Sequence, residues 1–553
     1  MWVLAFELRL NWRPHPCEQS PRPSYFAAGL AALGVLALYV ATLAPTTAAW
    51  DTSEYITAAY TLGIPHPPGN AFFVLLGHVF TLLPIAPTPA ERVNLLAALC
   101  GALTAGIWFL IAERVAVRWL KHRWQGLTVG ALAAVLSATA FTVWNQSVVN
   151  EKVYMVSLLF FAVVSWLTVV WCDDPESRRA DRLLLMIAFL LGLGYTNHPA
   201  GLLVGPAVAI AVLARRPRTA LRWGLLLRAL GLFALGLTVF MFEPIRAAQQ
   251  PELNEGDTTG CLHGLEWSCT FSATTVQRLS ANLNRDQYGK PSLMQRQAPI
   301  TAQVGMWWLY FKWQWLRDAT GTHAAAQALL AAVFLVLGLY GGLLHYKHDR
   351  RSFWFFGPLV GTVTIALVYY MNFKYGFSQD PQLTGVAREV RDRDYFYVWG
   401  FSAWGVWAAL GLTGVWSTIA ELFRRRPDAG RASGTIPTRS WLMAAPVLAL
   451  ALVPLVGNWS AANHRGDTFV RDMASDLLNS VEPYGILIVG GDNDTFPLWY
   501  AQQVEGIRRD VTVAIPELLG TDWYVRTLIR RPDYPYDAAA GPAMFRNHLW
   551  LMP

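Results

Sequence analysis

The sequence predicts a polytopic α-helical membrane protein with about eleven transmembrane helices. Of its 553 residues, 54% are hydrophobic and only 15% are charged, whereas soluble domains carry about 25% charged residues. Several apolar runs reach the roughly 20 residues that a helix needs to cross a bilayer. The 25 Trp and 20 Tyr residues suit aromatic belts at the two membrane surfaces.

The net charge of +7 reflects topology rather than nucleic-acid binding. Basic residues cluster in short connections between apolar runs, as in Arg118, Lys121 and Arg123. Cytoplasmic loops of membrane proteins carry such an excess of Lys and Arg. We therefore place these loops and the N-terminal segment 1–24 in the cytoplasm, and we expect no nucleic-acid partner.

The spans follow from apolar length and loop charge. In order, they fall near 25–44, 94–117, 127–144, 153–171, 183–196, 199–213, 223–243, 324–345, 353–371, 396–420 and 441–458. Residues 71–85 are also apolar, but this run is short and is followed by prolines. Counting it as a span would put every Arg-rich loop outside, so we interpret it as a re-entrant or interfacial helix. The transmembrane module 25–458 then has external loops 45–93, 145–152, 244–323 and 372–395.

The sequence predicts that the tail 459–553 forms a small extracytoplasmic α/β domain. Residues 485–489 and 511–515 are short buried-strand patterns, and Pro497 lies early in a helix between them. Gly490 to Asp494 is best explained as turn and helix-cap chemistry. One interpretation is that a larger domain has been cut short at Pro553. Upstream, Cys261 and Cys269 lie in one external loop and can pair there.

The segment WDTSEYITAAYTLGIPHPPGN begins at Trp50, just beyond the first span. Asp51 and Glu54 are three residues apart and share one face of a helix. They form either a capping box or an acidic pair that serves as general base or substrate clamp. The prolines after His66 force a rigid turn that holds the acids at the membrane surface, and this favours the second interpretation.

Further polar residues occupy the same external face. His66 and His198 each precede a proline in a turn, but no third ligand at useful spacing accompanies them, so we expect no metal site. Glu151 is either a second acid or an exposed helix end.

External arginines have no role in topology, and a guanidinium can bind phosphate through two hydrogen bonds. The candidates are Arg246, Arg285, Arg388, Arg391 and Arg393. We expect one or two of them to bind a lipid phosphate.

The ordered series WDTSEY, HPPGN, EKVY, EPIRA, RDQYG, REVRDRDYFY and GDNDTFPLWYAQQVEGIRRDV resembles a bacterial family of the GT-C glycosyltransferase superfamily. That family is related to the vertebrate endoplasmic-reticulum protein O-mannosyltransferase that modifies IPT domains of plexins. The resemblance covers about residues 25 to 530.

The resemblance implies a transferase in the bacterial cytoplasmic membrane that moves one sugar, mannose or a similar hexose, from a polyprenyl-phosphate carrier to an acceptor on the outer face. Asp51 falls where these enzymes have their usual catalytic acid, with Glu54 beside it. Tyr288 of RDQYG joins Arg285 in the expected substrate site. The acceptor is a protein hydroxyl or an envelope lipid or polysaccharide, and metal use stays open. A transporter, and a scaffold whose tail binds envelope polymers, are the alternatives from other classes.

Overall fold

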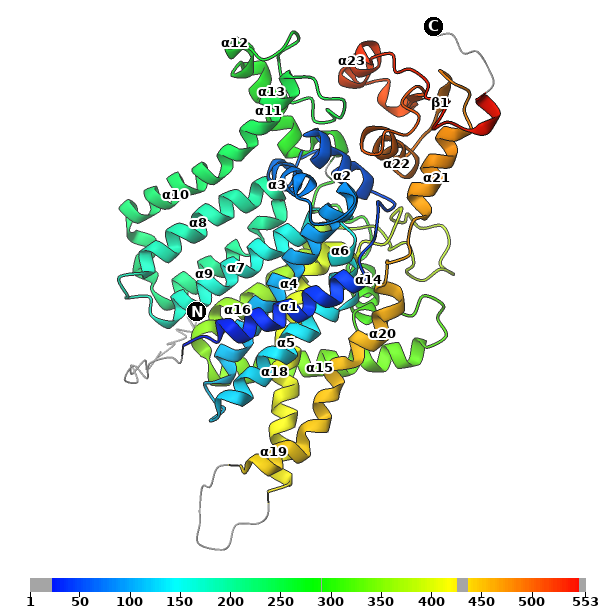
Figure 1. Ribbon diagram of the computed structural model, residues 1–553. Coiled ribbons are helices and arrows are strands. Elements are labelled where there is room, and N and C mark those ends of the chain that lie inside the picture. The colour runs from blue at the N-terminus through cyan, green and yellow to red at the C-terminus, as the bar shows by residue number, and fades with distance from the viewer. Residues whose placement is uncertain (1–21, 290, 425–435, 547–553) are drawn as a thin grey trace, which may run out of the picture.

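The computed structural model describes residues 22–289, 291–424 and 436–546, and most of this chain is helical (Figure 1). The first half contains α1 Tyr25–Ala41, α2 Thr52–Thr61, α3 Ala71–Leu82, α4 Pro89–Ala116, α5 Arg123–Thr139, α6 Phe141–Val148, α7 Tyr154–Asp173, α8 Ala180–Asn197, α9 Gly205–Arg215, α10 Trp223–Leu237 and α11 Phe242–Ala248. The second half contains α12 Trp267–Thr270, α13 Ala273–Asn284, α14 Ile300–Trp313, α15 Ala324–His348, α16 Arg350–Gly361, α17 Leu367–Met371, α18 Val398–Leu422, α19 Thr438–Ala444, α20 Val453–Ala462, α21 Phe469–Asn479, β1 Ile486–Ile488, α22 Asp492–Gln503, β2 Thr512–Ala514 and α23 Asp522–Arg530.

Each of the eleven predicted spans coincides with a helix or a run of joined helices. Seven of these, counted within the described residues, are long and apolar enough to cross a membrane, and the bent pair α5–α6 makes an eighth. The helices at 25–41 and 199–215 are apolar but shorter. The chain is therefore a multi-pass membrane protein. The number of crossings and the interfacial position of α3 stay predictions, and segment 1–24 lies mostly outside the described residues.

The predicted span 127–144 contains a sharp bend, because the chain breaks at Ala140 and α6 leaves α5 at 70°. The break exposes the amides of Phe141 and Thr142. Gln314, just after α14, accepts both of them, through its carbonyl at 3.3 Å and through its side chain at 3.0 Å. A polar partner from a distant helix thus makes the bend possible. The predicted external loop 145–152 is correspondingly half helical.

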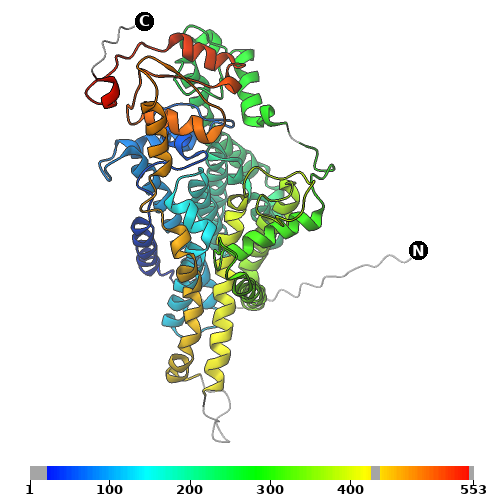
Figure 2. The same ribbon diagram turned by 90° about the vertical axis from the view of Figure 1, so that its right-hand side faces the viewer.

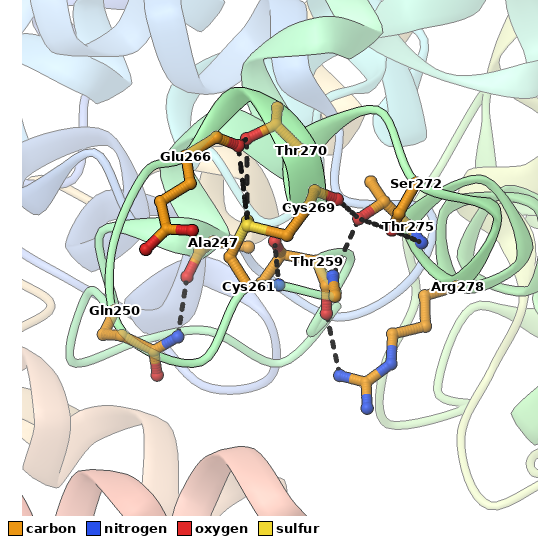
Figure 3. Close-up of a disulfide and its surroundings, with 11 residues drawn as sticks. Ala247, Gln250, Thr259, Cys261, Glu266, Cys269, Thr270, Ser272, Thr275 and Arg278 are labelled. Atoms are coloured by element: carbon orange, nitrogen blue, oxygen red, sulfur yellow. Dashed lines mark hydrogen bonds between the residues drawn. A yellow bond between two sulfur atoms is a disulfide. The ribbon is translucent and has the colours of Figure 1, made fainter.

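The predicted external loop 244–323 contains the three helices α12, α13 and α14. Figure 3 shows the Cys261–Cys269 disulfide that the sequence allowed. Thr275 on α13 donates its hydroxyl to the Cys269 carbonyl at 2.7 Å, and Arg278 donates to the Thr259 carbonyl at 2.9 Å. These bonds fix α13, whose end delivers Arg285 to the region described below.

The tail contains two strands and an intervening helix at the predicted positions, but β1 is not the buried strand that the sequence predicted, since Ile486 and Ile488 are 66% and 70% exposed. β1 and β2 pair in parallel, with Ile486 opposite Thr512 and Ile488 opposite Ala514. α22 connects them, and Trp499 on this helix packs against Ala58 of α2 and its neighbours. Figures 1 and 2 show α2, α3 and α21–α23 together at one end of the molecule, whereas α19 lies at the other. The tail therefore rests on the Asp51 segment.

Helices α15 and α18 pack through glycines. A Cβ at Gly411 of α18 would collide with the Leu337 carbonyl oxygen, and one at Gly341 of α15 would collide with the Trp407 carbonyl. Small residues at such crossings let two backbones approach closely. We predict that Gly411→Ala separates the helices and destabilises the protein by about 1–3 kcal/mol, which lowers the apparent Tm in detergent.

Gly231 of α10 is the matched control, because nothing lies within 4 Å of the Cβ that it would gain. Gly231→Ala is expected to be neutral or slightly stabilising, since alanine favours a helix by about 1 kcal/mol over glycine. Equal thermal stability of Gly411→Ala and Gly231→Ala would contradict the close packing of α15 on α18.

Candidate functional site

Within the segment that was predicted to be the first external loop, Glu54 joins the start of α2 to His66. Asp51 is the N-cap of α2 but makes no side-chain capping hydrogen bond. Glu54 is fully buried, and its carboxylate accepts the backbone amide of His66 and pairs with His66 Nδ1, both at 2.6 Å. The capping-box interpretation of Asp51 and Glu54 is therefore wrong. Glu54 instead holds His66 beside the start of α2.

The turn after His66 is held on two sides. Gly69 has φ +80°, and the Glu243 carboxylate lies 2.6 Å from the position that a Cβ would take, so only glycine fits there. Asn70 donates to the Asn197 carbonyl at 2.6 Å and accepts from Tyr55 at 3.1 Å. This network ties the first external segment to the turn that carries His198.

Asp51 is nearly buried, with 6% of its surface exposed, and lies in a chain of alternating charges. Its carboxylate forms an ion pair with Lys152, and its Oδ2 is 3.9 Å from His66 Nε2. The next acid, Glu151, is paired with Arg391 and accepts from Gln146 at 2.7 Å. The guanidinium of Arg391 stacks over Trp50 at 4.4 Å and over Tyr395 at 4.5 Å. Glu151 is therefore not a solvated helix end.

Asn94 on α4 brings these two segments together. Its amide group donates to the Ala44 and Thr46 carbonyls at 3.0 Å each, and its carbonyl accepts the Asn150 amide at 2.9 Å. One buried side chain thus anchors the approach to Asp51 and the start of the Glu151–Lys152 pair.

Two of the five predicted phosphate-binding arginines are used structurally, which corrects the sequence-based assignment. Arg246 donates to the Leu62 carbonyl at 2.7 Å and the Thr61 carbonyl at 3.1 Å, so it caps the end of α2. Among the described residues, the Arg388 side chain donates to backbone carbonyls of the 376–383 loop, including Asp380 at 2.7 Å. Both guanidiniums thus use several of their five donors on the protein's own backbone, which leaves fewer for a phosphate.

The remaining arginines differ in how many of their side-chain donors are already used in hydrogen bonds or ion pairs. Arg393 pairs with Glu389 at 3.0 Å and donates to Tyr395 at 2.7 Å. Arg285 has φ +58° at the end of α13 and lies 5.4 Å from the Tyr288 ring. Within the described residues, the Arg285 side chain makes no hydrogen bond or ion pair, and its Nε is buried without a partner. It is the one predicted phosphate ligand whose donors are unoccupied.

The positive charge of Arg285 acts on both histidines. Burial among Arg285, Lys152 and His66 lowers the pKa of His198 to about 3, and its Nδ1 accepts the Ala200 amide at 3.1 Å. His198 is therefore neutral and carries its proton on Nε2. Burial opposes protonation of His66 as well, but the Glu54 carboxylate outweighs it and raises the pKa of His66.

The structure adds four residues that sequence reasoning missed as members of this region. Burial, and then the charge of Glu54, raise the pKa of Glu255 well above its usual range, and one buried carboxylate oxygen of Glu255 has no hydrogen-bond partner among the described residues. Burial, and then Arg391, Arg393 and Arg285, lower the pKa of Lys152 well below its usual range, while Asp492 opposes them. From the tail, Asn493 accepts the Trp50 amide at 2.7 Å.

Of these four residues, only Lys152 could have been found from the sequence, because it is a cation on the predicted external face, as the arginines are. Glu255 belongs to no sequence motif that indicates a chemical role. Asp492 and Asn493 lie in the segment that we interpreted from the sequence as a turn and helix cap. Among the residues that the structure describes, no group of three or more His, Cys, Asp or Glu side chains is arranged to hold a metal ion.

Two family models match the chain. Residues 51–221 match the protein O-mannosyl-transferase TMEM260 N-terminal domain, and residues 470–548 match the TMEM260-associated domain 2. Among solved structures, the chain is similar to ArnT from Cupriavidus metallidurans bound to undecaprenyl phosphate, at 13% identity over 91% of this chain and 87% of that one, with a TM-score of 0.48. It is also similar to oligosaccharyltransferase AglB from Archaeoglobus fulgidus with an inhibitory peptide and a dolichol-phosphate, at 12% identity over 89% and 64%, with a TM-score of 0.47.

Two curated proteins are similar along most of the chain. The protein O-mannosyl-transferase TMEM260 of Mus musculus is 25% identical over 90% of this chain and 63% of its own length. Its namesake from Dictyostelium discoideum is 22% identical over 90% of this chain and 58% of its own length. The chain thus spans about three fifths of the length of these relatives. It is a membrane protein related to the TMEM260 protein O-mannosyl-transferases.

Proposed function

We propose that this protein is a GT-C glycosyltransferase that moves a single mannose, or a similar hexose, from a polyprenyl-phosphate carrier to the hydroxyl of a protein Ser or Thr. The similarity to TMEM260 proteins over 90% of the chain supports the reaction class. The observation that carries the proposal is the buried pair that Asp51 of the 45–93 loop forms with Lys152 of the 145–152 loop. We place the reaction on the extracytoplasmic face of a bacterial cytoplasmic membrane.

Asp51 is the proposed general base. Its carboxylate takes the proton of the acceptor hydroxyl, whose oxygen attacks the anomeric carbon of the sugar. The bond from that carbon to the phosphate oxygen breaks, its electron pair stays on the phosphate, and the sugar inverts its configuration.

Arg285 is the proposed partner of the leaving phosphate, with Tyr288 supporting its guanidinium from 5.4 Å. Negative charge develops on the leaving group in the transition state, and a positioned cation lowers that barrier. Arg391 and Arg393 already face Glu151 and Glu389, so their charges are largely compensated. We therefore propose that Arg285 contacts the phosphate directly, whereas Arg391 and Arg393 add positive electrostatic potential around it.

Glu54 and His66 are proposed as positioning groups rather than as a second base. Glu54 is occupied by two hydrogen bonds from His66. Glu54 also raises the pKa of His66, and His66, when protonated, places a cation 3.9 Å from the Asp51 carboxylate. A cation at this distance favours the ionised form of Asp51 that proton abstraction needs. His198, neutral and with Nε2–H available, is suited to donate a hydrogen bond to a sugar hydroxyl.

The alternatives differ in what they transfer and to what. A transporter would move a solute into proteoliposomes without any transfer of sugar, and it would need ionisable residues near the middle of the membrane. A transferase that acts on envelope lipid or polysaccharide would label those acceptors instead of a peptide. Supplying labelled mannosyl-phosphoryl-polyprenol with each acceptor class in turn distinguishes these cases.

Asp51→Asn is predicted to lower the rate of sugar transfer by about 10²–10⁴, the usual cost of losing a positioned base. The measurement is transfer from a labelled polyprenyl-phosphate mannose to acceptor in proteoliposomes. Asp467→Asn is the matched control, because Asp467 is an exposed acid whose one ion pair among the described residues is with His464. Full activity of Asp51→Asn would exclude it as the base.

Arg285→Gln is predicted to lower kcat by about 10²-fold, as expected when one stabilising donor is lost from a developing negative charge, while Arg285→Lys keeps part of the activity. The same transfer assay with a donor titration measures both. Arg465→Gln is the control, since Arg465 is an exposed arginine after α20 without an acidic partner among the described residues. An effect of Arg285→Gln no larger than that of the control would remove Arg285 from the phosphate site.

The Glu54–His66 pair predicts the direction of a pH effect on stability. Because folding raises the pKa of His66, the pair contributes fully below the unfolded value of about 6.5 and loses its contribution as pH rises through the folded value. The difference in apparent Tm between wild type and His66→Gln should therefore be largest below about pH 6.5 and shrink toward alkaline pH. A difference that grows with pH would contradict the pairing.

A further inference from the structure

A cavity of about 400 Å³ lies at the opposite end of the helix bundle from Asp51, around the turn between α4 and α5. α4 begins near the Asp51 segment, where Asn94 binds the Ala44 carbonyl. The helix then runs for 28 residues, or roughly 42 Å at 1.5 Å per residue, before it reaches this turn. The cavity is thus separate from the proposed transfer site.

Four permanent cations line the cavity, namely Arg22, Arg114, Lys121 and Arg123, against one acid, Glu113. Glu113 is already used, because its carboxylate accepts the amide of Ser24 at 3.1 Å and its hydroxyl at 2.5 Å. Arg114 is paired with Asp173. The other three cations make no ion pair within the described residues. The cavity therefore carries uncompensated positive charge, which favours an anionic ligand.

A second cavity of about 360 Å³ lies on the other side of the same turn and shares Leu120, Lys121 and His122 with the first. Its lining includes the rings of Trp119, Tyr340 and Trp441. Trp and Tyr rings are enriched at the level of lipid headgroups, where one end is apolar and the other is hydrated. A ligand at this turn thus meets cations on one side and aromatic rings on the other.

We propose that the α4–α5 turn binds the phosphate group of an anionic glycerophospholipid. Arg and Lys are the side chains that bind phosphate most strongly, and basic pockets between transmembrane helices bind anionic headgroups. The adjoining aromatic cavity accommodates the glycerol and the upper acyl chain, which a free phosphate ion would leave empty. The same phosphate chemistry in a soluble anion is the competing source.

The test uses the full chain in nanodiscs of phosphatidylcholine with and without phosphatidylglycerol. Lys121→Gln/Arg123→Gln removes two exposed cations of the cavity, and Arg178→Gln/Arg179→Gln removes two exposed cations from the α7–α8 turn, which lines neither cavity. Retention of phosphatidylglycerol, measured by native mass spectrometry, should fall by about 10- to 30-fold in the first variant and stay at the wild-type level in the second.

Equal retention in both double variants would overturn the site. Arg22→Gln provides a second, independent variant, and its retention should fall as well. A separate arm titrates inorganic phosphate against the protein in phosphatidylcholine alone. Thermal stabilisation that saturates there, and that is lost in Lys121→Gln/Arg123→Gln, would overturn the lipid as the source of the phosphate. The absence of such stabilisation supports the lipid.

Discussion

The buried ion pair between Asp51 and Lys152 is the constraint on which the rest of the site depends. A charge removed from water costs several kcal/mol unless a partner compensates it, so the segment that carries Asp51 and the segment before α7 have to meet. Glu151, next to Lys152, is paired in turn with Arg391. This second ion pair joins the distant 388–397 segment to the site. Alternating charges thus assemble pieces from three parts of the chain, and Asn94 fixes the first two in register.

The fold was predictable where the information is local. Every span predicted from apolar length coincides with a helix or with joined helices, and both strands lie within the strand patterns at 485–489 and 511–515. The break at Ala140 was not predictable, because the sequence around it stays apolar and its freed amides are accepted by Gln314, which lies far along the chain. The number of crossings depends on how short helices such as α1 sit in a bilayer, and composition alone does not determine that.

The candidate site also has a part that the local sequence predicts and a part that it does not. Asp51, Glu54 and His66 lie within sixteen residues of one another, so spacing and proline chemistry drew attention to them. The arginines could not be ranked, because Arg285 and Arg388 are identical in type and differ only in what surrounds them. Carbonyls of one loop occupy Arg388, whereas Arg285 keeps its donors free. Glu255 and Asn493 enter from segments whose local sequence signals only turns and caps.

The most direct test of the account is a structure of the protein with a mannosyl-phosphoryl-polyprenol analogue bound. The account predicts that the phosphate lies within hydrogen-bond distance of Arg285, and that the anomeric carbon faces Asp51 with room for an acceptor hydroxyl between them. A headgroup bound at Arg388 or Arg246, or on the side of the membrane where the α4–α5 turn lies, would contradict it.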